Sequence, residues 1–202
     1  MQKFHDITIQ EQKVALRKYI KQVKTSLTPE EKRLQSEEIC AQIEKCEEFI
    51  KADIVMLYWA MSDEVDLNTL IMKWYDKKKI LLPCVTQDVL EIRLFTGLDS
   101  MKMGPSFKIL EPIGEKFTAV EEIDLVVVPG VAFDVNNNRM GRGKGYYDKF
   151  LPHTHAHKLG ACFNIQLFEK VPHDALDIKM DLVFSPLAKY THDKIIKDVF
   201  MN

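Results

Sequence analysis

Hydrophobic and polar residues follow each other along the chain in a pattern that predicts strands separated by helices. The strongest strand signal is the run 124–130, where Leu125-Val126-Val127-Val128 is rich in β-branched residues and Pro129-Gly130 ends it. An uninterrupted apolar run of this length is typical of a strand that is buried on both faces of a parallel sheet. Because ligands gather at the carboxyl ends of such strands, the residues after Gly130 are where we expect a site.

The rest of the chain shows the same alternation. We predict helices over 11–25, 28–49 and 67–77 and one that begins near Gly145, and strands over 54–60, 80–85, 90–96, 124–130, 158–163 and 182–184. Strands that alternate with helices indicate an α/β fold with a largely parallel sheet. Gly104-Pro105 and Glu111-Pro112 interrupt the stretch 97–122, which we expect to be irregular.

Particular residues predict three further details of the helices. Val14, Tyr19 and Val23 are expected among the apolar positions of the first helix. Thr28-Pro29-Glu30-Glu31 predicts a capping box at the start of the second. The helix after Gly145 is expected to place Tyr146, Phe150 and Leu151 on its inner face.

The composition is that of an ordinary globular protein and narrows the possible partners. With 202 residues, of which 46% are hydrophobic and 29% charged, we predict one domain spanning 1–202. A net charge of −2 does not favour bulk binding to nucleic acid or to a membrane. No apolar run has the length of a membrane span, and residues 1–6 lack the apolar core of a signal peptide. The cysteines are scattered without a Cys-x-x-Cys pair, as in reduced proteins, so we expect a cytoplasmic protein.

The segment 138–148 carries the clearest chemical signal. It combines Arg139, Arg142 and Lys144 with three glycines, two tyrosines and Asp148. Alternating glycines let the backbone approach a ligand and turn N–H groups toward it, and the cations add positive charge. This combination favours a polyphosphate ligand, and Asp148 could hold the magnesium ion that accompanies it. The alternative is a basic surface turn without a ligand.

Two familiar phosphate-binding loops do not fit this segment. A Walker A loop needs Ser or Thr after its Gly-Lys pair, whereas Gly145 follows Lys144. A dinucleotide fingerprint needs its glycines directly after the strand, whereas residues 131–138 intervene here. A Rossmann-type NAD site is therefore not expected.

The same residues resemble a known family. Pro129-Gly130-Val131-Ala132-Phe133-Asp134, followed by Arg139-Met140-Gly141-Arg142-Gly143-Lys144-Gly145-Tyr146-Tyr147-Asp148, is similar to the signature of the 5-formyltetrahydrofolate cyclo-ligases. Weaker similarities occur in the same order at 13–17, 63–66, 171–174 and 177–181. The resemblance implies a three-layer α/β/α sandwich with one site at the carboxyl edge of the sheet. It also implies ATP-dependent closure of 5-formyltetrahydrofolate to 5,10-methenyltetrahydrofolate.

The resemblance further implies roles for individual residues. Those expected to bind ATP are Lys13, Arg17, Arg139, Met140, Gly141, Arg142, Gly143, Lys144, Gly145, Tyr146 and Tyr147. Those expected to bind the folate are Trp59, Glu64, Phe107, Arg142 and Tyr146. Arg142 and Lys144 are expected to act on the transferred phosphoryl group, and Asp148 and Asp177 to hold Mg²⁺.

Some alternatives stay open. His153, His155 and His157 alternate and could bind zinc, although we interpret them as a polar loop because no cysteine or carboxylate stands beside them. A folate- or nucleotide-binding protein without turnover is the second functional hypothesis, disfavoured because Arg142, Lys144 and Asp148 are all present. We expect a monomer with 5-formyltetrahydrofolate and ATP as its partners, while the sequence leaves the polyglutamate preference undetermined.

Overall fold

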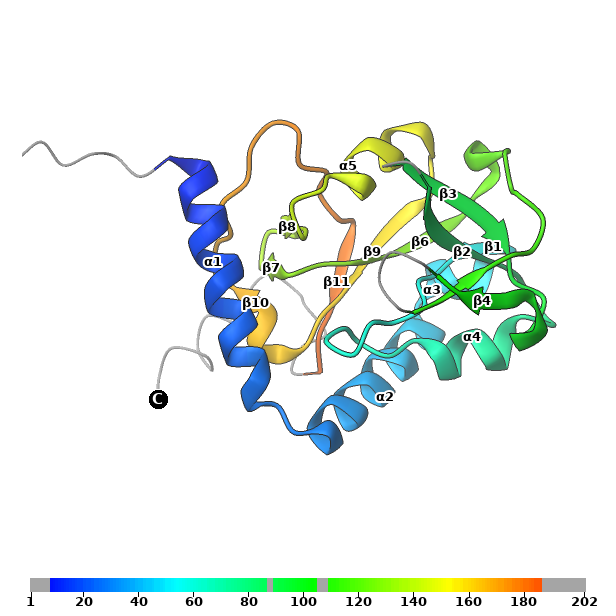
Figure 1. Ribbon diagram of the computed structural model, residues 1–202, viewed down its shortest axis with the longest axis horizontal. Helices are drawn as coiled ribbons and strands as arrows, with labels where there is room; N and C mark the ends of the chain where they lie inside the picture. Colours follow the sequence, from blue (N-terminus) through cyan, green and yellow to red (C-terminus); the bar gives the residue numbers. More distant parts are fainter. Residues whose placement is uncertain (1–7, 87–88, 105–108, 187–202) are drawn as a thin grey trace, which may run out of the picture.

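The computed structural model describes residues 8–86, 89–104 and 109–186 of the 202-residue chain. Its centre is a six-stranded sheet in the order β11-β9-β6-β1-β2-β3 (Figure 1). The strands are β1 (Ile54–Met56), β2 (Lys79–Thr86), β3 (Val89–Leu94), β6 (Leu125–Pro129), β9 (His157–Ala161) and β11 (Leu182–Phe184). All neighbouring pairs are parallel except β2 and β3, which form an antiparallel pair at one edge. The predicted α/β fold with a largely parallel sheet is confirmed.

Helices cover both faces of this sheet. They are α2 (Pro29–Lys45), α3 (Glu47–Lys51), α4 (Asn68–Trp74) and α5 (Tyr146–Phe150), whereas α1 (Ile9–Val23) packs elsewhere. In β6, Val127 packs with α2, α3 and α4, whereas its neighbour Val128 packs with α5 on the opposite face. Figure 1 shows the resulting layers, with α2 and α4 below the sheet and α5 above it. None of the described helices is long and apolar enough to cross a membrane.

A second, smaller sheet supports the glycine segment. It contains β7 (Ala132–Asp134), β8 (Arg139–Met140) and β10 (Leu167–Phe168) in the order β10-β7-β8. Asp134 is fully buried and accepts hydrogen bonds from the backbone of Asn136, Asn138 and Val171, which closes the turn between β7 and β8. Asn137 takes the left-handed conformation in this turn, with φ of 64°. The strand β8 therefore delivers the chain directly into residues 141–145.

Helix α1 lies against this smaller sheet, beside β7, β8 and β10 at the left of Figure 1. Of the three apolar positions predicted for it, Val14 and Tyr19 are exposed, which is contrary to a place on the inner face, whereas Val23 is partly buried. The buried positions are Lys13 and Ile20, with Leu16 and Val23 partly buried beside them. The hydrophobic pattern does not reveal the inner face, because that face carries the cations Lys13 and Arg17, which bond to polar groups inside the protein.

The other predicted elements are present with shifted ends. The capping box of Thr28 and Glu31 at the start of α2 is confirmed. The helix predicted over 28–49 breaks at Cys46 into α2 and α3, and the strand predicted over 54–60 ends at Met56. The stretch 97–122 is not wholly irregular, since β4 (Met101–Met103) and β5 (Leu110–Pro112) form an antiparallel pair in it.

Packing between the two sheets generates a first prediction. A Cβ atom on Gly160 of β9 would lie 2.5 Å from Cε1 of Phe133, a ring that is fully buried. The variant Gly160→Ala should therefore lower the free energy of unfolding by about 1–3 kcal/mol, the usual cost of overpacking. Urea denaturation measures this. Combining it with Phe133→Leu should cost less than the sum of the two single variants; strict additivity would contradict the steric explanation.

Candidate active site

A pocket of about 140 Å³ opens at the carboxyl ends of β1, β2 and β6. The loop after β1 contributes Trp59 and Glu64, β2 contributes Pro83, and the chain after β6 contributes Gly130. The opposite wall is the glycine segment, with Arg139, Gly141, Arg142, Lys144, Gly145, Tyr146, Tyr147 and Asp148. The sheet thus brings together many of the residues predicted for the nucleotide and several of those predicted for the folate, whereas Lys13, Arg17 and Met140 do not line this pocket.

Glycine is required by the backbone of residues 141–145. Gly143 and Gly145 have φ of 101° and 69°, a region that other residues rarely adopt, and α5 begins directly after Gly145. Arg17 of α1 holds this loop, because its Nε donates to the carbonyl oxygen of Gly141 at 2.9 Å. A Cβ atom on Gly143 would lie 3.3 Å from Cζ of the same arginine. Helix α1 and the glycine loop are therefore in direct contact, as the predicted shared site requires.

Arg139 differs from the other cations of the segment because it is buried. Its guanidinium donates to Asp148 Oδ1 at 2.6 Å and to the carbonyl oxygen of Pro129 at 3.3 Å, and lies over the ring of Tyr147. Met140 is also buried, and its side chain packs with Ile20 of α1. The side chains of Arg139 and Met140 thus support the loop from beneath, whereas Lys144 and Arg142 are exposed above it.

Lys13, which was predicted at the nucleotide, is engaged by acidic residues. Its Nζ lies 2.7 Å from Asp174 Oδ2 and 2.5 Å from Asp177 Oδ2, and its side chain is only 5% exposed. The hydrogen bond from Lys13 is the main reason why the pKa of Asp174 is lowered. Burial alone would lower the pKa of Lys13, but the two carboxylates outweigh burial and raise it.

The predicted metal ligands Asp148 and Asp177 come from neighbouring segments. The backbone N–H of Ile178 donates to Asp148 Oδ1 at 3.3 Å, which places the chain after Asp177 beside Asp148. The hydrogen bonds of Asp148 with described residues use Oδ1, and those of Asp177 use Oδ2. One oxygen of each carboxylate is therefore available, which fits a hard cation such as Mg²⁺.

Other metal arrangements find less support. In the described ranges no group of three or more histidine, cysteine or acidic side chains is arranged to hold a metal ion. His153, His155 and His157 are exposed, but they do not form one loop as predicted, because His153 ends a short 3-10 helix and His157 begins β9. A cation between Asp148 and Asp177 would therefore need further ligands from outside the protein, such as phosphate oxygens or water.

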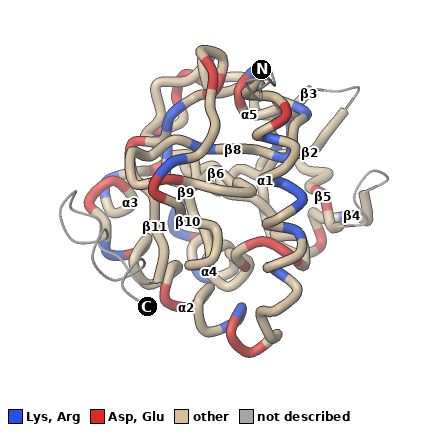
Figure 2. Tube along the Cα trace, turned by 90° about the vertical axis from the view of Figure 1, so that its left-hand side faces the viewer, with Lys and Arg blue, Asp and Glu red and all other residues tan. Residues whose placement is uncertain are grey.

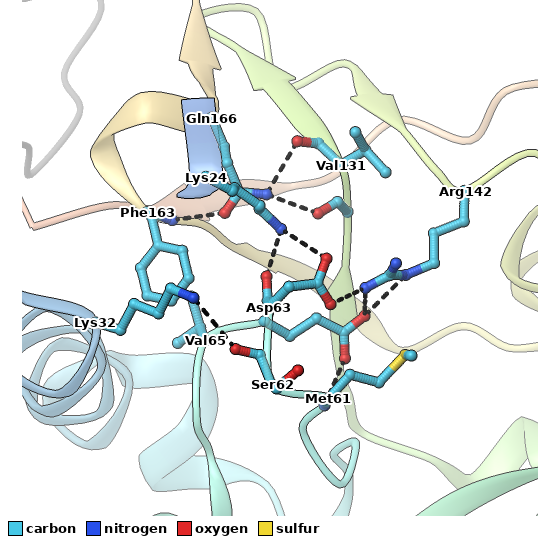
Figure 3. Close-up of polar contacts among 12 residues, drawn as sticks. Lys24, Lys32, Met61, Ser62, Asp63, Val65, Val131, Arg142, Phe163 and Gln166 are labelled. Carbon is cyan, nitrogen blue, oxygen red and sulfur yellow. Dashed lines mark hydrogen bonds and ion pairs between the residues drawn. The ribbon is translucent and has the colours of Figure 1, made fainter. Parts of the chain in front are cut away.

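Arg142 is held by two consecutive acidic residues across the pocket entrance. Its Nη2 lies 2.6 Å from Asp63 Oδ1 and 3.0 Å from Glu64 Oε1, and its Nε donates to the same Glu64 oxygen at 3.2 Å (Figure 3). Glu64 also accepts from the backbone N–H of Met61 at 3.0 Å. Although burial opposes its charge, these carboxylates raise the pKa of Arg142, so the guanidinium is firmly cationic.

Aromatic side chains form the apolar wall of the pocket. Trp59 is half-buried and packs against Phe95 with ring centroids 6.2 Å apart. Tyr146 and Tyr147 line the pocket from α5. Burial raises the pKa of Tyr147 well above its usual value, so this phenol stays protonated. Phe107, which was predicted at the folate, lies outside the described residues.

Comparisons with known proteins show the family and the fold. A sequence model of the 5-formyltetrahydrofolate cyclo-ligase family matches residues 9–186. The chain belongs to this family. It is 29% identical to a probable 5-formyltetrahydrofolate cyclo-ligase of Schizosaccharomyces pombe, over 82% of this chain and 87% of that protein. It is 27% identical to the 5-formyltetrahydrofolate cyclo-ligase of Mus musculus, over 88% and 95%. The structure of Aquifex aeolicus 5,10-methenyltetrahydrofolate synthetase is similar with a TM-score of 0.79 and 34% identity, over 87% and 90%.

Sequence reasoning missed two charged residues of this cyclo-ligase family member. Asp63 was noted only as part of the segment 63–66, yet it contacts Arg142. Lys24 was not singled out, yet its buried side chain reaches Asp63. The sequence did contain a signal for Lys24. Lys13, Arg17 and Lys24 are spaced by four and seven residues, so they share one face of a helix.

The ion pairs of Lys13 generate a second prediction, about stability and pH. Lys13→Met should lower the free energy of unfolding by about 1 kcal/mol near neutral pH, because water reaches the partly buried carboxylates and screens part of the attraction. Asp174 has a lowered pKa in the folded state, so its contribution is present above its usual pKa of about 4 and is lost on further acidification. The difference from wild type should therefore shrink at about pH 3.

Urea denaturation at both pH values measures this difference. Lys18→Met is the matched control, because Lys18 is exposed on the same helix. An equal loss for Lys13→Met at both pH values would assign the effect to packing and not to charge.

Proposed function

We propose that this protein converts 5-formyltetrahydrofolate and ATP into 5,10-methenyltetrahydrofolate, ADP and phosphate. The observation that carries this proposal is a single pocket in which an apolar, acidic wall faces a basic glycine loop. Trp59 and Glu64 on one side suit a flat, polar ring system, and Gly141 to Gly145 on the other suit a polyphosphate. The family to which the chain belongs supports the same reaction.

The reaction explains why two substrates must meet in one pocket. A formyl group on nitrogen is a poor electrophile, because the nitrogen lone pair donates into the carbonyl. When the formyl oxygen attacks the γ-phosphoryl group of ATP, ADP leaves and the oxygen becomes part of a phosphate leaving group. N10 of the same folate then attacks the formyl carbon and closes the ring, its proton passes to solvent, and phosphate departs with the former formyl oxygen. Positioning and charge stabilisation are what such a transfer needs from a protein.

The nucleotide would lie between α1 and the glycine loop. Backbone N–H groups of Gly141, Gly143 and Gly145 can approach phosphate oxygens closely, and Lys144 adds an exposed cation. Arg17 contributes from α1, and Lys13 neutralises the acidic segment beside it. In this proposal Arg139 and Met140, which are buried, contribute to nucleotide binding by shaping the loop. Tyr146 and Tyr147 line the pocket and would contact the nucleotide there.

Arg142 and Lys144 are proposed as the catalytic residues. Arg142 is placed at the boundary between the acidic wall and the glycine loop, where the phosphoryl group would pass from ATP to the formyl oxygen. A guanidinium has five N–H donors, and the ion pairs with Asp63 and Glu64 use only those on Nε and Nη2. The donors on Nη1 can stabilise the charge on the transferred group.

Asp148 and Asp177 are proposed to hold Mg²⁺, which when bound would neutralise charge on the phosphates of ATP. The available oxygens of the two carboxylates support this assignment. The cations Arg139 and Lys13 orient the carboxylates through their other oxygens. Trp59, Glu64, Arg142 and Tyr146 are proposed folate contacts, with Phe107 as a further candidate.

Covalent catalysis by the protein is not needed and finds no support in the described residues. Burial raises the pKa of the thiol of Cys40 to about 12 and that of Cys162 still further, so neither is a ready nucleophile. Tyr58 is buried and donates its hydroxyl to the carbonyl oxygen of Val65, and its pKa is also raised. The cytoplasmic location and monomeric state stay predictions.

The proposed function is tested by mixing the protein with 5-formyltetrahydrofolate and MgATP and following the absorbance of the methenyl product. Release of ADP in equal amount is expected, because one phosphoryl transfer accompanies each ring closure. A folate- or nucleotide-binding protein without turnover would leave the spectrum unchanged, although calorimetry would still detect binding.

The position of Arg142 generates a third prediction. Arg142→Ala should lower kcat by about 100-fold or more, while the dissociation constant of 5-formyltetrahydrofolate changes much less, because charge on the phosphoryl group is greatest in the transition state. Steady-state kinetics and calorimetry separate the two effects. Equal losses in kcat and folate affinity would assign Arg142 to binding or folding.

The carboxylates generate a fourth prediction. Asp148→Asn should raise the Mg²⁺ concentration required for half-maximal activity, because a neutral amide is a poorer ligand for a hard cation. It should also weaken Mg²⁺-dependent binding of a non-hydrolysable ATP analogue in calorimetry. Unchanged Mg²⁺ titrations in both assays would remove Asp148 from the proposed metal site.

A further inference from the structure

Asp63 lies between two cations that come from distant parts of the chain. Its Oδ1 is 2.6 Å from Arg142 Nη2, and its Oδ2 is 3.5 Å from Lys24 Nζ. Lys24 also donates to the main-chain carbonyl oxygen of Asp63. Figure 3 shows the two cations approaching Asp63 from opposite sides, Lys24 from the end of α1 and Arg142 from the glycine loop.

The two cations differ in burial. The side chain of Lys24 is 7% exposed, whereas those of Asp63 and Arg142 are 40% and 41% exposed. Burial lowers the pKa of Lys24, and the negative charge of Asp63 opposes that effect. A buried ammonium needs its partners, and both of the hydrogen bonds described for the ammonium of Lys24 go to Asp63. Lys24 is therefore the fixed end of the arrangement, and the more exposed Arg142 is the end that can move.

Asp63 also differs from its neighbour Glu64. Glu64 and Arg142 both line the pocket, whereas Asp63 and Lys24 do not. A folate that bonds to Oε1 of Glu64 would compete with Arg142 for that oxygen. Among the described residues, Asp63 would then be the acidic partner that still holds Arg142 in place. Its effect on the reaction would pass through Arg142 and not through contact with substrate.

We propose that Asp63, anchored by Lys24, is a positioning residue that holds the guanidinium of Arg142 at the pocket for phosphoryl transfer. This inference rests on the proposed role of Arg142. Holding Nη2 leaves the guanidinium aligned before the substrates arrive, and such preorganisation lowers the cost of ordering a flexible side chain in the transition state. The competing explanation is a purely structural contact between the end of α1 and the loop after β1.

The variants Asp63→Asn and Lys24→Met test this proposal. Each should lower kcat by about tenfold, because coupling between contacting charged groups is commonly of that size. The Michaelis constant for 5-formyltetrahydrofolate should stay within about twofold, because neither residue lines the pocket. A structural contact alone would lower the thermal midpoint without this separation of kcat from the Michaelis constant.

Lys32→Met is the matched control. Lys32 is also a lysine that donates to the same loop, but it comes from α2 and its bond goes to the carbonyl oxygen of Ser62 at 3.4 Å, not to Asp63 (Figure 3). Its kcat should equal that of the wild type. A similar loss of kcat in all three variants would overturn the proposal, because it would reflect general disturbance of the loop.

A double-mutant cycle decides whether Asp63 acts through Arg142. In the background of Arg142→Ala, adding Asp63→Asn should change kcat no further. A full additional tenfold loss would overturn the proposal. If Asp63→Asn does not fold, Lys24→Met/Asp63→Asn replaces it in the cycle, because that variant leaves no buried ammonium without a partner.

The same cycle separates this inference from the proposed function. A wild-type kcat for Arg142→Ala would overturn the role of Arg142 and the positioning role of Asp63 with it. A large loss for Arg142→Ala together with a wild-type kcat for Asp63→Asn would keep the proposed function and overturn the positioning role alone. Absence of any methenyl product from the wild-type protein would overturn both.

Discussion

The inner face of α1 is polar, and the site depends on it. Along this face and the turn that follows, Lys13, Arg17 and Lys24 each bind a different segment: the acidic residues at 174–177, the glycine loop and the loop after β1. Figure 2 shows the basic positions that recur along the helix. Buried or half-buried cations are costly without partners, so α1 docks well only where all three segments are in place.

The cations of the glycine segment divide into two kinds. Arg139 is buried and orients Asp148 from beneath the loop, whereas Arg142 and Lys144 are exposed toward the pocket. The buried arginine stabilises a backbone conformation that brings positive charges close together. Charge compensation by carboxylates is what makes this density of cations compatible with a stable fold before any anionic ligand binds.

The two proposed substrates approach from different sides of the same pocket. The nucleotide would face α1 and the glycine loop, and the folate would face the aromatic wall with Trp59 and Glu64. Arg142 connects the two sides, because it belongs to the glycine loop and is bonded to acidic residues of the folate side. A single guanidinium at this boundary can respond to both ligands, which suits a reaction that needs both present before chemistry begins.

The sequence by itself determined the fold class, the capping box of α2 and the central strand β6, because these follow from local periodicity and capping chemistry. It also located the glycine loop, since closely spaced glycines and cations are typical of a loop that binds an anion. Tertiary structure alone decided which face of α1 is buried, that Arg139 lies inside, and that Lys24 and Asp63 support Arg142. The partners of Lys13 and Lys24 are 39 to 164 residues away along the chain, and local hydrophobic patterns contain no information about a cation whose carboxylate or carbonyl partner is that distant. Asp148 and Pro129, the partners of Arg139, are nearer in sequence, but only the fold turns its side chain toward them.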